Sequence, residues 1–181
     1  MDEVDVMVIG GGNAALCAAL AAAERGARVL VLERAPAERR GGNSFVAAGA
    51  MRFPYRGIED LAQIVPDPRL RTPEKLEIGE YSEEEFFSDL QRVTQGEGDP
   101  DLGRALASQA FPTMLWLHEK GVEFVLAYDR QSFLVNGRHR FWGGVVVKTQ
   151  GEGPGLVGAL YRAAQRARVA VQYGARATSL E

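Results

Sequence analysis

Residues 4–15 read Val-Asp-Val-Met-Val-Ile-Gly-Gly-Gly-Asn-Ala-Ala, and this stretch decides the fold that the sequence predicts. The apolar run Val4–Ile9 is typical of a short buried strand, and the three glycines after it indicate a tight turn. The alanine-rich run Asn13–Arg25 predicts a helix that ends at Gly26. A largely apolar run, Arg28–Glu33, then predicts a second strand, in a parallel sheet that is covered on both faces. The order strand, glycine turn, helix, strand is one βαβ unit.

The glycine turn also indicates a ligand class. Gly10 permits the tight turn, Gly12 lets the backbone approach a pyrophosphate, and Ala15 keeps helix and sheet close. The helix N-terminus, Asn13–Ala14, presents N–H groups and the positive end of the helix dipole to the phosphates. Glu33, at the end of the next strand, can accept hydrogen bonds from a ribose, which disfavours NADP. A bare glycine turn is the alternative, but strand, helix and acid in this order predict dinucleotide binding.

Composition excludes several other functions. With 181 residues and 46% hydrophobic content the chain can form one domain, and 21 basic against 24 acidic residues give a net charge of −3, which does not suit a nucleic-acid binder. The longest apolar run, Ala14–Ala23, is about half of the ~20 residues that a membrane span needs, and residues 1–5 are acidic, unlike a signal peptide. We therefore expect a cytoplasmic protein. The single cysteine, Cys17, excludes an internal disulfide and a cysteine-based metal cage, so we expect no metal and redox chemistry only through an organic cofactor.

The segment after Glu33 helps to decide which dinucleotide the domain binds. An NAD domain would usually continue with another helix and strand, whereas residues 34–52 are punctuated by glycines and predict an extended loop. The small residues 47–50 would let backbone amides approach a flat ring. An NAD-dependent dehydrogenase remains an alternative that a purified protein without flavin absorbance would favour.

The same loop resembles the flavoprotein family of fumarate reductases and succinate dehydrogenases. Their motif, Gly-Gly-Asn-Ser/Thr followed by Ala-Ala-Gly and Met, matches Gly42–Met51. The resemblance implies that Ser44 and the backbone of the small residues contact the pyrophosphate and isoalloxazine of FAD. It also implies noncovalent FAD, because Asn43 stands where the membrane-associated members attach the flavin to a histidine. By the same resemblance, Ala177, beyond a returning strand at Val169–Tyr173, reads adenine; an ordinary helix–strand unit is the alternative.

The candidate cofactor-binding residues are Gly10, Gly12, Asn13, Ala14, Ala15, Glu33, Arg34, Gly42, Asn43, Ser44, Ala48, Gly49, Ala50 and Ala177. We expect an α/β fold, a Rossmann-like FAD-binding domain of the glutathione-reductase type. The chain would be the N-terminal part of that domain, truncated at an expected strand over residues 176–181.

A narrower resemblance, to tricarballylate dehydrogenases, rests on further segments in matching order. These are residues 41–53, 57–61, 81–87, 129–133 and 141–144. The resemblance implies hydride transfer from a small tricarboxylate or dicarboxylate to flavin N5, giving an alkene such as cis-aconitate, with electrons passing to a partner protein. It also implies a catalytic arginine supported by a carboxylate, but no stretch here matches those motifs, so no catalytic residue is assigned. Two departures are Glu152, which replaces a glycine, and Pro112, inside a helix that is usually free of proline.

Other functions stay open beside this one. The chain could belong to another member of the family, which reduces fumarate or oxidises a 3-oxosteroid, or could be an inactive nucleotide-binding fragment. A basic cluster around His139, residues 137–141, could face a tricarboxylate because arginines bind carboxylates in a bidentate manner. A solvated hairpin tip explains the same cluster.

The rest of the chain divides by its local patterns into five expected parts. These are a βαβ unit with the flavin loop (1–52), a proline-rich linker or excursion (53–81), a helical segment (82–127), a hairpin region (128–153), and a helix with the returning strand (154–181). Ser82 and Glu85 have capping-box spacing before a helix, and Pro112 should kink or split the next helix. Asn136-Gly137 predicts a tight hairpin turn.

Overall fold

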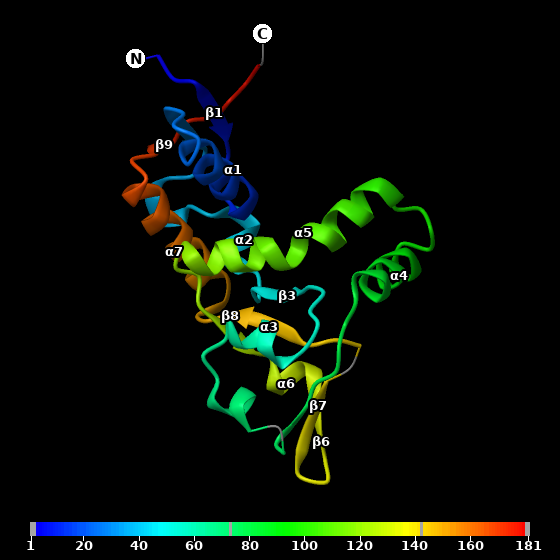
Figure 1. Ribbon diagram of the computed structural model, residues 1–181. Coiled ribbons are helices and arrows are strands. Elements are labelled where there is room, and N and C mark those ends of the chain that lie inside the picture. The colour runs from blue at the N-terminus through cyan, green and yellow to red at the C-terminus, as the bar shows by residue number, and fades with distance from the viewer. Residues whose placement is uncertain (1–2, 73, 142, 180–181) are drawn as a thin grey trace. The chain divides into compact units, whose positions relative to one another are not determined.

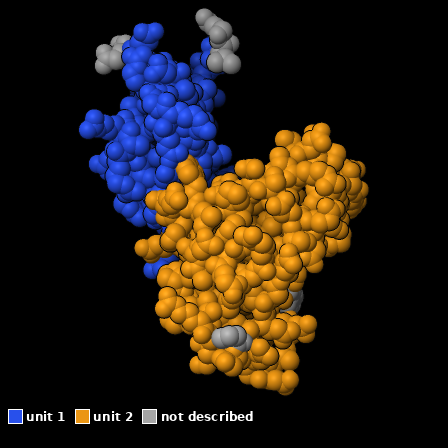
Figure 2. All heavy atoms as spheres, in the orientation of Figure 1, with its two compact units in different colours: residues 1–49, 120–122, 149–181 blue, residues 50–119, 123–148 orange. Residues whose placement is uncertain are grey.

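The computed structural model describes residues 3–72, 74–141 and 143–179 (Figure 1). They form two compact units, which are coloured separately in Figure 2. Unit 1 comprises residues 1–49, 120–122 and 149–181, and unit 2 comprises residues 50–119 and 123–148. Each unit is built from segments far apart in the sequence.

Unit 1 is an α/β layer whose sheet has the order β1-β2-β9. Its strands are β1 (Val6–Ile9), β2 (Val29–Glu33) and β9 (Ala170–Tyr173), and both pairings are parallel. Two helices, α1 (Asn13–Ala23) and α7 (Glu152–Arg166), pack against each other. The predicted βαβ unit and the returning strand are therefore confirmed, and β9 lies beside β2.

The core of unit 1 forms where one face of the sheet meets the apolar faces of the helices. Leu16 and Leu20 of α1, Val31 of β2 and Leu160 of α7 are at most 2% exposed. The opposite face of the sheet carries Met7 and Ile9, whose side chains are exposed. Successive strand residues point to opposite faces. One face of the sheet is thus covered within the described residues, and the other presents apolar side chains.

The loop predicted after β2 contains short helices. These are η1 (Ala37–Arg39) and α2 (Gly42–Val46), and α2 packs against α7. The expectation of an extended loop without a packed element was wrong for α2. A five-residue helix is little more than one turn, so it shows no apolar period that a sequence pattern could detect.

Unit 2 contains two small sheets and several helices. The sheet orders are β3-β8-β5 and β4-β7-β6. The strands are β3 (Ala50–Arg52), β4 (Leu76–Glu77), β5 (Phe124–Leu126), β6 (Ser132–Val135), β7 (Arg138–Phe141) and β8 (Val146–Thr149), whose last residue belongs to unit 1. The helices are α3 (Ile58–Ala62), η2 (Pro68–Arg71), α4 (Glu83–Val93), α5 (Pro100–Glu119) and α6 (Tyr128–Gln131).

Residues 53–81 differ from the linker that their prolines and charges suggested. Phe53, Leu61, Ile64 and Tyr81 are at most 4% exposed, so the segment contributes to the core of unit 2. The apolar residues that do this are spaced irregularly around prolines, and no strand or helix period connects them. Burial here is set by tertiary packing, which a local pattern does not report.

The helix signals of unit 2 are confirmed in one case and corrected in another. Ser82 and Glu85 form a capping box at the start of α4. In contrast, α5 runs unbroken through Pro112, so of the two outcomes predicted there, a kink or a split, the split was wrong. A proline removes the hydrogen bond to the carbonyl four residues earlier. That residue, Ser108, is exposed, so water can satisfy its carbonyl.

The hairpin prediction is confirmed at its turn. Strands β6 and β7 pair antiparallel, and Asn136 and Gly137 between them have φ values of +49° and +79°. Two positive φ values in a two-residue loop are the geometry that the Asn-Gly pair favours. The strand expected over residues 176–181 is absent from its described part, 176–179, and residues 180–181 lie outside the described residues.

Candidate cofactor site

The glycine turn between β1 and α1 forms one side of the site. Gly10 has a φ of +105°, in the left-handed region that favours glycine, and its N–H donates to the carbonyl of Leu32 at 2.8 Å. A Cβ added to Gly10 would lie 4.0 Å from the Cβ of Ala15, so the small side chain keeps α1 close to the turn. A Cβ on Gly12 would lie 3.3 Å from Ser44 Oγ. The turn is therefore a backbone cradle in which the conformation at position 10 favours glycine and a Cβ at position 12 would be tight against Ser44.

The N-terminus of α1 has a positive electrostatic potential that favours binding of an anion. Its N-cap, Gly12, has no side chain to cap the helix, and no acidic residue stands in the first turn. The positive end of the helix dipole is thus not neutralised by the helix itself. The N–H of Asn13 donates to Ser44 Oγ at 3.0 Å, across 31 positions of sequence. This bond joins the loop after β2 to the helix N-terminus, and both segments can contact one pyrophosphate.

Gly11 is a site residue that sequence reasoning missed. Its carbonyl accepts a hydrogen bond at 3.1 Å from the hydroxyl of Tyr161, which is on α7, 150 positions away. A Cβ on Gly11 would collide with that hydroxyl and would lie 2.6 Å from Glu33 Oε2. Burial raises the pKa of Tyr161 to about 12, so its hydroxyl stays protonated and can donate. The middle glycine of the run, which the Gly-x-Gly motif does not require, was the only sequence signal for this contact.

Glu33 closes the site at the end of β2. Its side chain is 8% exposed, and Oε1 accepts the N–H of Ala35 at 2.7 Å. Its backbone carbonyl accepts the N–H of Ala175 at 3.0 Å, which ties the segment after β9 to this end of the sheet. Ala177 follows two residues later and is exposed, and Arg34 is exposed beside Glu33. The acid is therefore held in position where the strand ends meet.

Helix α2 and the residues around it are fitted closely to α7. Gly41 has a φ of +103°, and a Cβ on it would lie 2.8 Å from Val157 Cγ1. The N–H of Gly153 donates to the carbonyl of Ala47 at 2.9 Å. A Cβ on Gly153 would lie 2.5 Å from the carbonyl of Phe45, so this position requires glycine. These contacts hold the end of α2 on the first turn of α7.

The remaining candidates of the flavin loop lie in different surroundings. Gly42 and Asn43 are exposed in α2, and Ala48 is half-buried. Gly49 is buried with a φ of +65°, and its carbonyl accepts the N–H of Thr149 at 3.0 Å. Ala50 begins β3 and is described with unit 2, and Ala14 is exposed on α1. The structure thus brings Gly12, Asn13 and Ser44 together and leaves several other candidates at the surface.

Glu152, where a glycine was expected, has the backbone conformation of a glycine. Its φ is +55°, and its carbonyl accepts the hydroxyl of Thr149 at 2.7 Å. Left-handed conformations are costly for residues with a Cβ. The acid stands in the first turn of α7, where the helix dipole partly offsets that cost.

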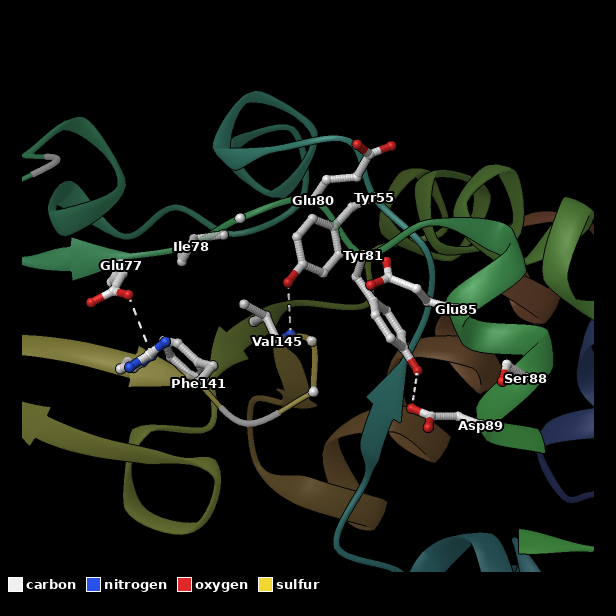
Figure 3. A pocket seen from close by; sticks show the side chains of 14 residues that line it. Tyr55, Glu77, Ile78, Glu80, Tyr81, Glu85, Ser88, Asp89, Phe141 and Val145 are labelled. Carbon is white, nitrogen blue, oxygen red and sulfur yellow. Dashed lines mark hydrogen bonds and ion pairs between the residues drawn. The ribbon is translucent and has the colours of Figure 1, made fainter. Parts of the chain in front are cut away.

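Unit 2 has a pocket of its own, of about 520 Å³ (Figure 3). The hydroxyl of Tyr55 accepts the N–H of Val145 at 2.8 Å, and the hydroxyl of Tyr81 donates to Asp89 at 2.7 Å. Burial raises the pKa of Tyr81 to about 12. The pocket is lined by four carboxylates, of Glu77, Glu80, Glu85 and Asp89. Arg140 also lines the pocket, and it pairs with Glu77 at 3.3 Å.

In the basic cluster of the hairpin, the side chain of His139 contacts other residues of unit 2. His139 Nδ1 lies 3.1 Å from Ser132 Oγ, and its ring contacts Tyr128 edge to face at 4.7 Å. Arg138 and Arg140 are exposed. The sequence also offers Trp142, beside Gly143-Gly144, either as a residue that lines a flavin or substrate cavity or as a core aromatic, and it lies outside the described residues. His139 is thus half-buried against an aromatic ring, not at a solvated tip.

The parallel sheet, the glycine turn and the acid at the end of β2 together define a dinucleotide-binding α/β domain. The chain belongs to the FAD binding domain family, whose sequence profile matches residues 5–181. FAD is therefore its cofactor. Of the described helices, none is long and apolar enough to cross a membrane.

This chain is similar to several known reductases. The fumarate reductase (cytochrome) of Shewanella frigidimarina is 28% identical over 175 residues, which are 97% of this chain and 27% of that protein. The urocanate reductase of Eggerthella lenta is 31% identical over 128 residues, 71% of this chain and 18% of the relative. The open conformation of a flavocytochrome c3 fumarate reductase gives a TM-score of 0.68 at 25% identity, covering 94% of this chain and 26% of that one. The chain thus spans about a quarter of the length of these fumarate reductases.

Proposed function

We propose that this chain is the FAD-binding part of an oxidoreductase that acts on a carbon–carbon bond of a small tricarboxylate or dicarboxylate. The hydrogen bond from the N–H of Asn13 to Ser44 Oγ carries the proposal, because it joins the glycine turn to the Gly-Gly-Asn-Ser segment. FAD, when bound, supplies the capacity to accept or donate a hydride. The role of this chain is to bind the cofactor and orient it.

Each candidate residue has a distinct part in holding FAD. The α1 N-terminus with Gly10, Gly12 and Ser44 would bind the pyrophosphate, because backbone N–H groups and the helix dipole favour an anion there. Glu33 would accept the ribose hydroxyls. The remaining candidates would contact the two ends of FAD. On the flavin side these are Gly42, Asn43, Ala48, Gly49 and Ala50, and on the adenosine side they are Arg34 and Ala177. Asn43 would leave the flavin noncovalently bound, as it offers no nucleophilic ring nitrogen.

Tricarballylate is the substrate that we propose first, and fumarate is the runner-up. Support for tricarballylate comes from the segments outside the cofactor motif, and support for fumarate from the fumarate reductases that the chain is similar to. The pocket of unit 2 favours neither by itself, because its four carboxylates outnumber Arg140 and would repel a polyanion. In this proposal the protein is cytoplasmic and passes electrons to or from a partner protein.

The test uses the purified full-length protein that contains this chain. We expect flavin absorbance, and we expect acid precipitation to release all of the FAD into solution; FAD retained in the pellet would contradict noncovalent binding. Dye reduction with tricarballylate is then compared with reduction of fumarate and of urocanate by reduced dye, and with oxidation of a 3-oxosteroid. Turnover of fumarate alone would favour the runner-up. A flavin-loaded protein inactive on the whole panel would refute the proposed activity.

Ser44→Ala tests the observation that carries the proposal. We expect the variant to bind FAD about tenfold more weakly, which corresponds to about 1.4 kcal/mol for a hydrogen bond to a charged group. Ser108→Ala, an exposed serine of α5, is the matched control and should leave FAD affinity unchanged. Equal FAD affinity of Ser44→Ala and the original protein would show that this hydroxyl has no part in the site.

A further inference from the structure

Unit 1 contains a second recess, bordered by α7 and β9. Its volume is about 440 Å³, within the range of small-molecule pockets, about 300–1,000 Å³. Six polar side chains line it: those of Arg40, Tyr161, Arg162, Gln165, Arg168 and Tyr173. Val169 and Val171 supply apolar contact. No carboxylate is among the residues that line this recess, which we call the α7–β9 groove.

The positive charge of the groove is not compensated. Among the described residues, no carboxylate forms an ion pair with Arg40, Arg162 or Arg168. Elsewhere in the chain arginines pair readily, as Arg28 does with Asp5 at 3.0 Å. Three guanidinium groups around one recess attract an anion, and a guanidinium binds phosphate through two parallel hydrogen bonds.

Arg168 is held in a conformation that costs stability. Its φ is +58°, at the position after the C-cap of α7, where helices usually place a glycine. A residue with a Cβ in this region is strained by its backbone. Arginine at this position therefore weakens the helix end while adding a third cation to the groove. Strained residues of this kind gather at functional sites.

The aromatic side of the groove is fixed. The guanidinium of Arg40 lies 4.7 Å from the centroid of the Tyr161 ring, and the hydroxyl of Tyr161 is bonded to Gly11. The ring of Tyr173 is 6.3 Å from that of Tyr161, tilted by 33°. Tyr161 is 8% exposed and its ring faces Arg40, whereas Tyr173 is half-buried, so the Tyr173 ring is the one that can stack with a nucleobase. Cations and one accessible ring in the same recess suit a ligand with both phosphates and a flat base.

We propose that the α7–β9 groove binds a polyphosphate group, carried by a nucleotide or by inorganic polyphosphate, beside the FAD site, which the groove meets at Tyr161. Arg162 and Arg168 would contact the phosphates directly. Arg40, stacked on Tyr161, would add the third positive charge near the phosphates. The expected binding weakens with salt, because exposed charges are screened.

The test is calorimetric titration of the FAD-loaded full-length protein at low salt, in separate experiments with ATP and with inorganic triphosphate. Tighter binding of ATP identifies a nucleotide site that uses the Tyr173 ring, and equal binding identifies a site that recognises phosphate alone. Neither ligand should release FAD, which flavin fluorescence follows. Absence of binding by both ligands at millimolar concentration would overturn the proposal, as would binding that displaces FAD.

Variants locate the binding to the groove. Arg162→Gln should weaken binding about tenfold. Arg168→Gly should weaken binding similarly while raising the melting temperature, because glycine relieves the strained backbone. A purely structural role of Arg168 would not give these opposite changes. Arg25→Gln, an exposed arginine bonded to the carbonyl of Ala21, is the matched control. Equal losses in the control and the groove variants would refute a specific site.

Discussion

Replacing Gly11 by alanine tests how closely α7 is fitted to the glycine turn. The φ of Gly11 is not positive, so alanine meets no backbone strain there, and the cost is steric. The new Cβ would meet the hydroxyl of Tyr161 and Glu33 Oε2, the latter at 2.6 Å. Overpacking of this kind costs about 1–3 kcal/mol. Displacing the Tyr161 hydroxyl adds about 1 kcal/mol for the lost hydrogen bond. We therefore expect Gly11→Ala to lower the free energy of unfolding by about 2–4 kcal/mol.

The second variant isolates the hydroxyl. Tyr161→Phe alone should cost about 1–3 kcal/mol, because the carbonyl of Gly11 loses its donor. In that background Gly11→Ala no longer collides with a hydroxyl, and only the contact with Glu33 remains. The two losses should therefore not add: we expect the double variant to be at least about 1 kcal/mol more stable than their sum.

The assay is urea unfolding of the apoprotein, followed by far-ultraviolet circular dichroism, for the two single variants and the double variant. Gly79→Ala is the control, because a Cβ there meets nothing within 4 Å and its φ is not positive. It should be neutral or slightly stabilising. Losses that add to within about 0.5 kcal/mol would refute the contact between α7 and the turn.

Three further changes probe local features. Glu152→Gly should raise the free energy of unfolding by about 0.5–1 kcal/mol, since glycine relieves the positive φ while the lost helix-dipole interaction offsets part of the gain; an unchanged melting temperature would count against that strain. Ser82→Ala should destabilise α4 by about 1 kcal/mol in urea unfolding, because the capping box with Glu85 is lost, and Ser108→Ala should not. The hydrogen bond from Arg92 holds the pKa of Asp89 below its ordinary value, so its stabilising effect is present above the unfolded pKa, near 4, and is lost as the pH falls through the folded value. Asp89→Asn should flatten the acid limb of a stability–pH profile, and an unaltered limb would contradict this.

Features that depend on adjacent residues were predictable from the sequence. The turn at Gly10, the capping box at Ser82 and the hairpin at Asn136 each need a backbone angle or a side-chain bond that few residue types supply. The parallel strand at Ala170–Tyr173 was predictable from its place after a helix, because βαβ connections return to the same sheet.

Features that depend on distant packing were not predictable. The short helix Gly42–Val46 forms because α7 offers a surface for it, and residues 53–81 are buried by tertiary contacts without a period of their own. For the cofactor site, the motifs identified Asn13 and Ser44 as separate candidates, and only the fold joins them by a hydrogen bond. Tyr161 carries no motif, so its bond to the glycine turn could not be read from the sequence.

The pairing of β2 with β9 affects how the chain is made. Val31 lies opposite Val171, 140 positions later (171 − 31). A ribosome that adds about 5–20 residues per second needs roughly 7–28 seconds to synthesise that interval. During this time one edge of β2 has no partner strand, and closing a loop of this length costs about 4 kcal/mol of chain entropy. Newly made chains therefore have a period in which an apolar strand edge is open to chaperones or to other nascent chains, and slower translation lengthens it.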